Sequence, residues 1–383
     1  MTWQPNGTVT VQGVDFTSDS LWGVSITYGR SIIWEQARAS YAQVQILNLD
    51  DVDNGFEVND SLVITMQDSG GTPQTVFTGK VTDISATMQN SGSNGEVVIQ
   101  TLTAVGPFAE MARKVVGTSA YPKEYDDDRM TTIFTEAGVT IDVVDTPPVY
   151  EFTARAADPA DAYSLASYYA QMAFGYIYET TTGEVGYANE SHRLIEVNTS
   201  GYWLIPESYI LWQGIESNRT LNDIINSIVL TYKANATKTA SDPTSISTYG
   251  EIAASIATEL ENAVEADYQA VRYIALRAFP QTNLSEFVVQ LDSPSVSSSD
   301  LDDFIGMYMG KPIQIAGLPI PLLNATYSGF VEGWTLTFTK FQAQIIIRST
   351  DATMSIVPTR WQDVNASLIW SAVDPALQWF QYE

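Results

Sequence analysis

One segment of this sequence occurs twice, about 250 residues apart. Residues 77–88 read FTGKVTDISATM and residues 327–338 read YSGFVEGWTLTF. Both copies begin with an aromatic residue, a small hydroxyl residue and a glycine, and then alternate between apolar and polar residues. Short strand patterns flank both copies, at 62–66 and 312–317 before them and at 97–103 and 344–350 after them. The recurring order of strand, glycine-marked strand and strand predicts one β module used twice.

Gly79 and Gly329 occupy the same place in the two copies. A glycine inside a strand pattern is typical of a bulge or of a bend at a barrel corner. Residues 1–104 contain several short alternating strands separated by turn clusters, which is typical of a barrel or a sandwich. We therefore expect a mainly β protein with α+β parts, in which two similar β-barrels are joined by a small α/β domain.

Helical patterns interrupt the β pattern after residue 105. The first module should end in a short helix at 106–115, and a second helix is expected at 126–138, with acidic residues at its start and a glycine at its end. A third is expected within 158–175, with Asp158 as N-cap and Pro159 in the first turn. A hairpin is predicted at 175–189. In the second module we predict strands at 227–234 and 286–292 and helices at 266–279 and 298–310.

These patterns divide the chain into four parts. We expect a first β-barrel at 1–112, a small α+β domain at 113–200, a second β-barrel with helical insertions at 201–350, and a tryptophan-rich tail at 351–383. The tail holds three tryptophans spaced by nine residues, namely Trp361, Trp370 and Trp379. Tryptophan is enriched in interface hot spots, so these residues are candidate anchors for a partner; a strap that packs on its own domain remains the alternative.

Charge and cysteine content exclude several classes of protein. The chain has 45 acidic and 18 basic residues, for a formal net charge of −27, which argues against neutralising phosphates in specific nucleic-acid binding. It contains no cysteine, so disulfides and thiolate metal sites are excluded. We find neither an apolar run long enough to cross a bilayer nor a standard secretion signal at the start of the sequence.

The sequence offers few candidates for catalysis. His192 is the single histidine, and it lies in a polar stretch typical of a surface loop or strand edge. The clusters Asp50, Asp51, Asp53 and Asp126, Asp127, Asp128 suit a hairpin turn and a helix N-terminus respectively. An EF-hand reading of residues 50–55 fails because Val52 stands at a ligand position, although a looser calcium site stays open. No cofactor motif is present, and we expect the protein not to be an enzyme.

Several segments resemble the minor tail proteins of long-tailed phages that infect actinobacteria. They are SITYGRSIIWEQARASYAQVQILNLDD (25–51), NDSLVIT (59–65), VFTGKVTDI (76–84), LTAVGPFAEMAR (102–113), ALRAFP (275–280), MGKPIQIAGLP (309–319), SGFVEGWTLTF (328–338) and WQDVNASLIW (361–370). Such proteins are similar to the hub proteins at the tip of phage tails. None of these segments is a catalytic signature, but together they span nearly the whole chain.

The resemblance implies a hub built from two β-barrels per chain and assembled as a homotrimer. Six barrels in a ring would match a six-fold tail tube or distal tail protein above to three-fold tip or fibre proteins below. DNA would pass through an acidic lumen without specific binding, and no membrane insertion is implied. The expected location is the tail tip of the virion. Two alternatives remain, a receptor- or carbohydrate-binding tip protein and a wall-degrading enzyme with two carboxylates facing a cleft.

Overall fold

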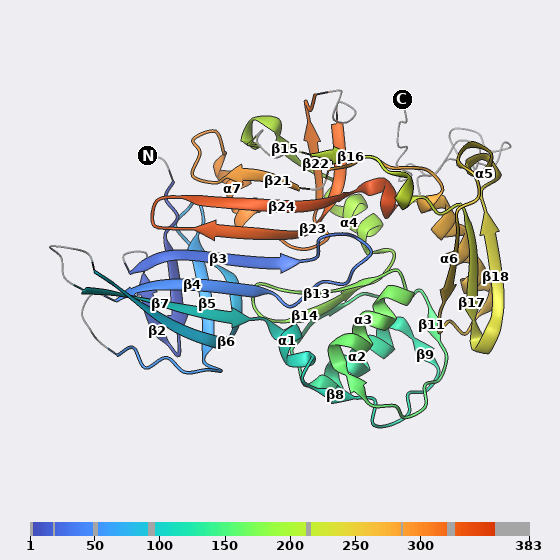
Figure 1. Cartoon of the computed structure of the whole chain (residues 1–383), viewed down its shortest axis with the longest axis horizontal. Helices are drawn as coiled ribbons and strands as arrows, with labels where there is room; N and C mark the ends of the chain where they lie inside the picture. Colours follow the sequence, from blue (N-terminus) through green and yellow to red (C-terminus); the bar gives the residue numbers. More distant parts are fainter. Residues whose placement is uncertain are drawn as a thin grey trace.

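The structure is a computed structural model that describes residues 3–17, 20–48, 53–90, 96–211, 216–284, 286–319 and 326–356. The described part is mainly β and is dominated by one large, mostly antiparallel sheet of twelve strands (Figure 1). Seven α-helices, α1 to α7, lie within these ranges. None of the described helices is long and apolar enough to span a bilayer.

The first module supplies seven strands of the large sheet, in the order β3-β4-β7-β6-β5-β1-β2. They are β1 Gly7–Val11, β2 Val14–Thr17, β3 Leu21–Gly29, β4 Tyr41–Asn48, β5 Ser61–Gln67, β6 Pro73–Asn90 and β7 Glu96–Val105, followed by helix α1 Pro107–Met111. The alternating strands expected within residues 1–104 are confirmed; in β4, for example, Ala42, Val44 and Ile46 are buried. The short helix predicted after this module is also confirmed.

The second module contributes five strands to the same sheet. They are β15 Trp203–Pro206, β21 Glu286–Gln290, β22 Pro312–Ala316, β23 Thr326–Phe338 and β24 Ala343–Asp351. The predicted unit of three consecutive strands is confirmed here, because β22 pairs with β23 and β23 pairs with β24, both antiparallel. Strand β21 lies beside β24, as β4 lies beside β7 in the first module.

The described strands do not form two separate closed barrels. Strand β23 of the second module pairs directly with β3 of the first, from Gly333 opposite Gly29 to Phe338 opposite Val24, and in Figure 1 the two ribbons run side by side. The expectation that a small α/β domain joins the two modules therefore missed their main connection. Backbone hydrogen bonds between β3 and β23 merge the modules into one sheet.

The α+β part follows the first module, and its helices α2 and α3 lie below the large sheet in Figure 1. It comprises β8 Val115–Val116, β9 Glu124–Tyr125, α2 Asp126–Ala137, β10 Ile141–Val144, β11 Glu151–Phe152, β12 Ala160–Asp161, α3 Ala162–Met172, β13 Tyr176–Glu179, β14 Val185–Ala188 and α4 His192–Ser200. Helix α2 ends at left-handed Gly138 as predicted. The prediction for α3 was wrong at its start: Asp161, not Asp158, caps the helix, because Ala160 and Asp161 first pair with β8.

A helical insertion forms the right side of Figure 1. It contains β16 Ser217–Asn218, β17 Ser227–Tyr232, β18 Ala236–Ser241, α5 Pro243–Tyr249, β19 Ala253–Ala257, α6 Ala263–Arg277 and β20 Asn283–Leu284, and α7 Ser298–Ile305 follows β21. The strand at β17 and the helix at α6 are confirmed. Helix α7 ends five residues before the predicted Gly310, because the Gly310 N–H donates to the carbonyl of Val331 in β23.

Glu179, at the end of β13, ties the α+β part to the first module. Its carboxylate accepts hydrogen bonds from the main-chain N–H of Ser40 at 2.6 Å and of Phe108 at 2.5 Å. Burial raises the pKa of Glu179 to about 7, despite these bonds. A buried carboxyl with a raised pKa favours folding when it is protonated.

We expect this carboxyl to make stability depend on pH between about 4.5 and 7. Its contribution is fully present below the pKa of the unfolded chain, about 4.3, and is lost as the pH rises through about 7. The loss should reach roughly 3 kcal/mol, since one pKa unit corresponds to ~1.4 kcal/mol. Urea unfolding of wild type and Glu179→Gln at pH 5 and pH 8 measures it, and equal pH dependence in both proteins would contradict the assignment.

Candidate assembly surface

The repeated segments form equivalent parts of β6 and β23. Gly79 of β6 lies opposite Leu62 of β5, and Gly329 of β23 lies opposite Ile313 of β22. Two residues after each glycine the pairing with the next strand slips by one residue, between Val81 and Asp83 in β6 and between Val331 and Gly333 in β23. Both copies therefore carry a β-bulge at the same position, which bends the strand.

Both glycines lie where a side chain would collide with its surroundings. A Cβ atom at Gly79 would come within 2.4 Å of the carbonyl oxygen of Val105 and within 2.7 Å of the Phe77 ring. A Cβ atom at Gly329 would come within 2.6 Å of both the carbonyl oxygen of Thr350 and the Tyr327 hydroxyl. The aromatic residue two positions earlier thus covers the glycine in both copies.

Replacing either repeat glycine by alanine should destabilise the fold. We expect Gly79→Ala and Gly329→Ala each to lower the free energy of unfolding by about 2 kcal/mol or more, because the neighbouring carbonyl oxygens belong to the backbone and overpacking of this kind costs ~1–3 kcal/mol. Gly23→Ala in β3 is the matched control, since its Cβ would meet only the Gln45 side chain, at 3.6 Å. Chemical denaturation measures all three variants, and equal losses would contradict the steric explanation.

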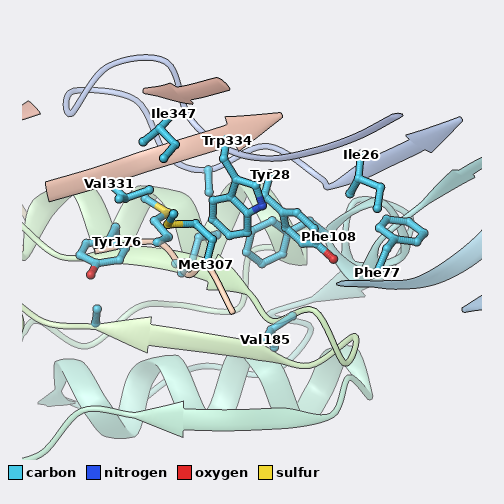
Figure 2. Packing of buried hydrophobic residues seen from close by; sticks show 14 of the residues in the cluster. Ile26, Tyr28, Phe77, Phe108, Tyr176, Val185, Met307, Val331, Trp334 and Ile347 are labelled. Carbon is cyan, nitrogen blue, oxygen red and sulfur yellow. The ribbon is translucent and has the colours of Figure 1, made fainter. Parts of the chain in front are cut away.

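One edge of β23 is fully covered, by two different strands. Its first half pairs with β22 from Thr326 to Phe330, and beyond the bulge the same edge pairs with β3. The Trp334 indole stacks on the Tyr28 ring with centroids 4.8 Å apart (Figure 2). Trp334, Leu336 and Phe338 are each at most 4% exposed, so this half of β23 is part of the core.

The same edge of β6 is only half covered. Strand β5 pairs with β6 from Pro73 to Lys80. This contact ends at Val81, whose carbonyl accepts from the Asn59 N–H and whose N–H donates to the carbonyl of Asp60. From Thr82 onward, no other strand of the described part of the chain lies on that edge. In the positions of Trp334, Leu336 and Phe338, β6 carries Ile84, Ala86 and Met88, of which Ala86 and Met88 are exposed. An exposed strand edge with an apolar face is a site for adding another strand.

The bulge residue also differs between the copies. In β23 it is Glu332, which is fully buried and lies 2.6 Å from the Arg30 guanidinium and 2.8 Å from that of Arg193. Burial alone would favour the neutral acid, but the two arginines hold the pKa of Glu332 below its usual range. In β6 the bulge residue is Thr82, whose hydroxyl donates to the carbonyl of Thr103. Glu332 therefore joins the β3–β4 connection and α4 to the second module.

The structure places the catalytic candidates in structural roles. The Asp126 carboxylate accepts bonds from the N–H of Val149 and the hydroxyl of Tyr187, which anchors the start of α2. His192 is not an ordinary surface residue: it opens α4, its ring is 23% exposed and its Nδ1 lies 2.8 Å from the Asp145 carboxylate. No group of three or more histidines and carboxylates that could hold a metal ion occurs within the described ranges.

Other candidates fall partly or wholly outside the described residues. Asp50, Asp51, Trp361, Trp370 and Trp379 all lie there. Of the first aspartate cluster, only Asp53 is described, and its carboxylate accepts a hydrogen bond from the N–H of Gly55, as expected of a turn residue. The anchoring role of the three tryptophans stays a prediction.

Sequence reasoning missed the two features that distinguish the copies. Nothing in the letters of β3 shows that β23 is its neighbour, since the two strands are about 300 residues apart. Glu332 carried one available signal, because it is a charged residue in the otherwise uncharged segment YSGFVEGWTLTF. A charge at that place could have suggested a buried ion pair.

Comparison with known proteins gives matches in structure but not in sequence. No family model matches the chain, and no curated protein matches it. Solved structures do match: the 43 kDa tail protein of prophage MuSo2 from Shewanella oneidensis, with a TM-score of 0.63, 11% identity and coverage of 92% of this chain and 100% of that one; and a tail protein from Neisseria meningitidis MC58, with a TM-score of 0.65, 11% identity and coverage of 92% and 98%.

A further match is the c3393 protein of E. coli, a component of the type VI secretion system described as structurally similar to T4 bacteriophage tail proteins gp27 and gp5. Its TM-score is 0.50, with 10% identity, and the match covers 92% of this chain and 79% of that one. At these identities the likeness shows the fold alone. The chain therefore has the fold of these tail and secretion-system proteins over nearly its whole length.

Proposed function

We propose that this protein is a structural hub of a phage tail tip, and that it assembles head to tail into a closed trimeric ring. The observation that carries this proposal is the unequal covering of two equivalent edges. The edge of β23 beyond its bulge is covered by β3 of the same chain, whereas the matching edge of β6 is open within the described part of the chain. Within one chain, β3 covers the edge of β23, but no described strand covers the matching edge of β6. A strand from a second copy of the chain could cover that edge of β6.

The open edge of β6 needs a strand that plays the role of β3. In the first module β3 lies beside β4. In the second module the corresponding place beside β21 begins at Ile210 and Leu211, where Ile210 forms an antiparallel bridge with Val289 and the Leu211 N–H donates to the carbonyl of Val288. We propose that this stretch of a neighbouring copy pairs with β6. Such a contact joins two different surfaces of the chain head to tail. It forms a closed ring when the rotation from one subunit to the next is a whole fraction of a full turn.

Three chains with two modules each would place six similar barrel-like units around one axis. That number suits a six-fold tail tube or distal tail protein above and three-fold tip or fibre proteins below. With a net charge of −27 per chain, the ring would repel DNA rather than bind it, so DNA could slide through the lumen. We further propose that Trp361, Trp370 and Trp379 of the C-terminal segment anchor a neighbouring component of the tip, and that the protein is located in the virion tail.

The proposal is tested by the mass of the purified protein and by its copy number in virions. We expect three times the chain mass of 42.1 kDa in solution and three copies in each tail. A monomer that is absent from virions would overturn the proposed function. If the protein is a monomer in solution but is present in three copies per virion, the ring forms only in contact with the neighbouring components of the tail.

A further inference from the structure

A cavity of about 330 Å³ lies at the junction of three parts of the chain. The β3–β4 connection forms one wall, the end of α3 with the start of β13 forms another, and α6 forms the third. Half-buried aromatic rings of Trp34, Phe174 and Tyr273 line it. Its volume is at the lower end of the ~300–1,000 Å³ range of ligand pockets, so it suits a small planar molecule.

The walls of the cavity are mostly apolar. Four aliphatic side chains add to the three rings, namely Ile33, Ile256, Leu276 and Met354. The ring centroids of Phe174 and Tyr273 lie 5.7 Å apart, within the range at which aromatic rings attract one another. A flat ring placed against them can add a further contact of the same kind. The lining therefore favours an aromatic occupant over a fully polar one.

Four arginines also line the cavity, namely Arg30, Arg193, Arg272 and Arg277. Three of them have carboxylate partners: Glu332 lies 2.6 Å from Arg30 and 2.8 Å from Arg193, and Glu190 lies 2.7 Å from Arg272. These ion pairs join the walls of the cavity to one another. Their guanidinium groups are therefore less available to an occupant than that of Arg277.

Arg277 is held in place but is not paired with a carboxylate. It is 8% exposed, its guanidinium carbon lies 3.5 Å from the Trp34 ring centroid, and its Nε donates to the main-chain carbonyl of Asp223 at 3.0 Å. Within the described ranges, no carboxylate forms an ion pair with it, and no group accepts a hydrogen bond from Nη1 or Nη2. Its two terminal nitrogens are thus the donors that an occupant can use.

Asp223 is the acidic neighbour of Arg277 and offsets only part of the cost of burying it. Burial, the larger effect, lowers the pKa of Arg277 from its usual value, whereas the charges of Tyr273 and Asp223 raise it by less. A guanidinium that remains destabilised by burial beside one carboxylate gains from a second negative charge placed at its free nitrogens. The occupant should therefore combine an aromatic ring with an anionic group.

We propose that the cavity binds a small aromatic carboxylate, whose ring packs against Trp34, Phe174 and Tyr273 and whose carboxylate accepts hydrogen bonds from Arg277. The planar guanidinium presents parallel N–H groups that match the two oxygens of a carboxylate. Stacking on Trp34 fixes the plane in which those groups point. This role goes beyond the proposed tail hub, and its test does not depend on ring assembly.

Two probes of nearly the same shape test the chemistry of this site. Naphthoate carries a carboxylate on a fused aromatic ring, and naphthamide carries an uncharged amide in its place. Titration calorimetry of the full-length protein measures the affinity of both. We expect naphthoate to bind about tenfold or more tightly than naphthamide, as expected for a charge-assisted hydrogen bond. The proposal is overturned if the two probes bind equally, or if neither binds at millimolar concentration.

Substitutions of Arg277 test which side chain makes the difference. Arg277→Gln should weaken naphthoate binding about tenfold or more and leave naphthamide binding unchanged, which also shows that the cavity is still folded. If this variant binds neither probe, Arg277→Lys decides, since it keeps the charge and should still prefer naphthoate. Arg113→Gln, which removes an exposed arginine outside the cavity, is the matched control and should bind both probes as wild type does. An unchanged preference for naphthoate in Arg277→Gln would contradict the proposal.

Fluorine NMR of the chain labelled with 5-fluorotryptophan shows where the probe binds. The Trp34 resonance is assigned with Trp34→Phe. We expect naphthoate to shift the Trp34 resonance and to leave that of Trp334 unchanged, since Trp334 is buried in the large sheet and does not line the cavity. A probe that binds without moving the Trp34 resonance occupies another place on the protein, and this result would overturn the proposed site.

Discussion

Ala86→Pro should abolish ring assembly while leaving the monomer folded. In β23 the N–H of Arg30 donates to the carbonyl of Glu332, and hydrogen bonds alternate along an antiparallel pair, so the main-chain groups of Trp334, Leu336 and Phe338 face β3. By the repeat, those of Ile84, Ala86 and Met88 face the open edge of β6. Proline at 86 removes an N–H from that edge but none from the pairing with β7. Proline removes one hydrogen bond of this pairing, and leaving its buried partner unsatisfied costs about 1–3 kcal/mol. This corresponds to about a 5- to 150-fold weaker contact, and the ring would contain three such contacts.

Analytical ultracentrifugation of wild type and variant measures this effect. The wild type should sediment as a trimer and Ala86→Pro as a monomer with an unchanged circular dichroism spectrum. A matched pair of charge variants separates the apolar face from the rest of the strand: Met88→Glu should weaken assembly, whereas Gln89→Glu, one residue along on the opposite face, should not. A trimeric and folded Ala86→Pro protein would show that the open edge of β6 is not the interface, even if the protein is a tail hub.

Glu332→Gln should produce the largest loss of stability of any single side-chain change discussed for this chain. It leaves the buried guanidinium groups of Arg30 and Arg193, which are 3% and 6% exposed, without their counter-charge. Removing one partner of a buried ion pair costs about 3–5 kcal/mol. Urea unfolding at pH 7 measures the difference in the free energy of unfolding between wild type and variant.

The matched control is Glu110→Gln, which breaks an exposed pair with Lys80. Such surface pairs contribute about 0–1 kcal/mol. The pH dependence supplies a second check. Because the pKa of Glu332 is lowered in the folded protein, its contribution is present above about pH 4.3, the unfolded value, and is lost as the pH falls through the folded pKa. Equal losses in the two variants would contradict a special role for Glu332.

Local structure could be predicted from the sequence where local chemistry determines it. Alternation identified β4, the glycine-marked repeat identified β6 and β23 with their neighbours, and the glycine after α2 fixed the end of that helix. These features depend on side-chain period and on backbone conformations that few residues adopt. The start of α3 was misplaced because Ala160 and Asp161 take part in a short pairing with β8, a tertiary contact that overrides the Asp-Pro pattern.

The sheet that joins the modules could not be predicted, for a physical reason. The repeated segments give β6 and β23 similar sequences. The alternation of apolar and polar residues is the same whether or not another strand pairs with the edge of the strand. What differs is the partner, and a partner about 300 residues away leaves no local periodicity. The burial of Leu336 and Phe338, against the exposure of Ala86 and Met88 at the matching positions of β6, is visible only in the fold. The cavity was hidden for the same reason, since its arginines come from three separate segments, namely the β3–β4 connection, α4 and α6.

The pairing of β3 with β23 has a consequence for the order in which the protein is made. Strand β3 leaves the ribosome about 300 residues before β23, and domains generally begin to fold during synthesis. The nascent first module therefore leaves the edge of β3 without its later partner, in addition to the outer half of β6, until the last strands emerge. Non-local pairing of this kind folds slowly and exposes edges to wrong partners. Completion of the second module thus covers the β3 edge. Only a chain synthesised as far as β23 therefore offers the outer half of β6 for ring assembly without a competing open edge at β3.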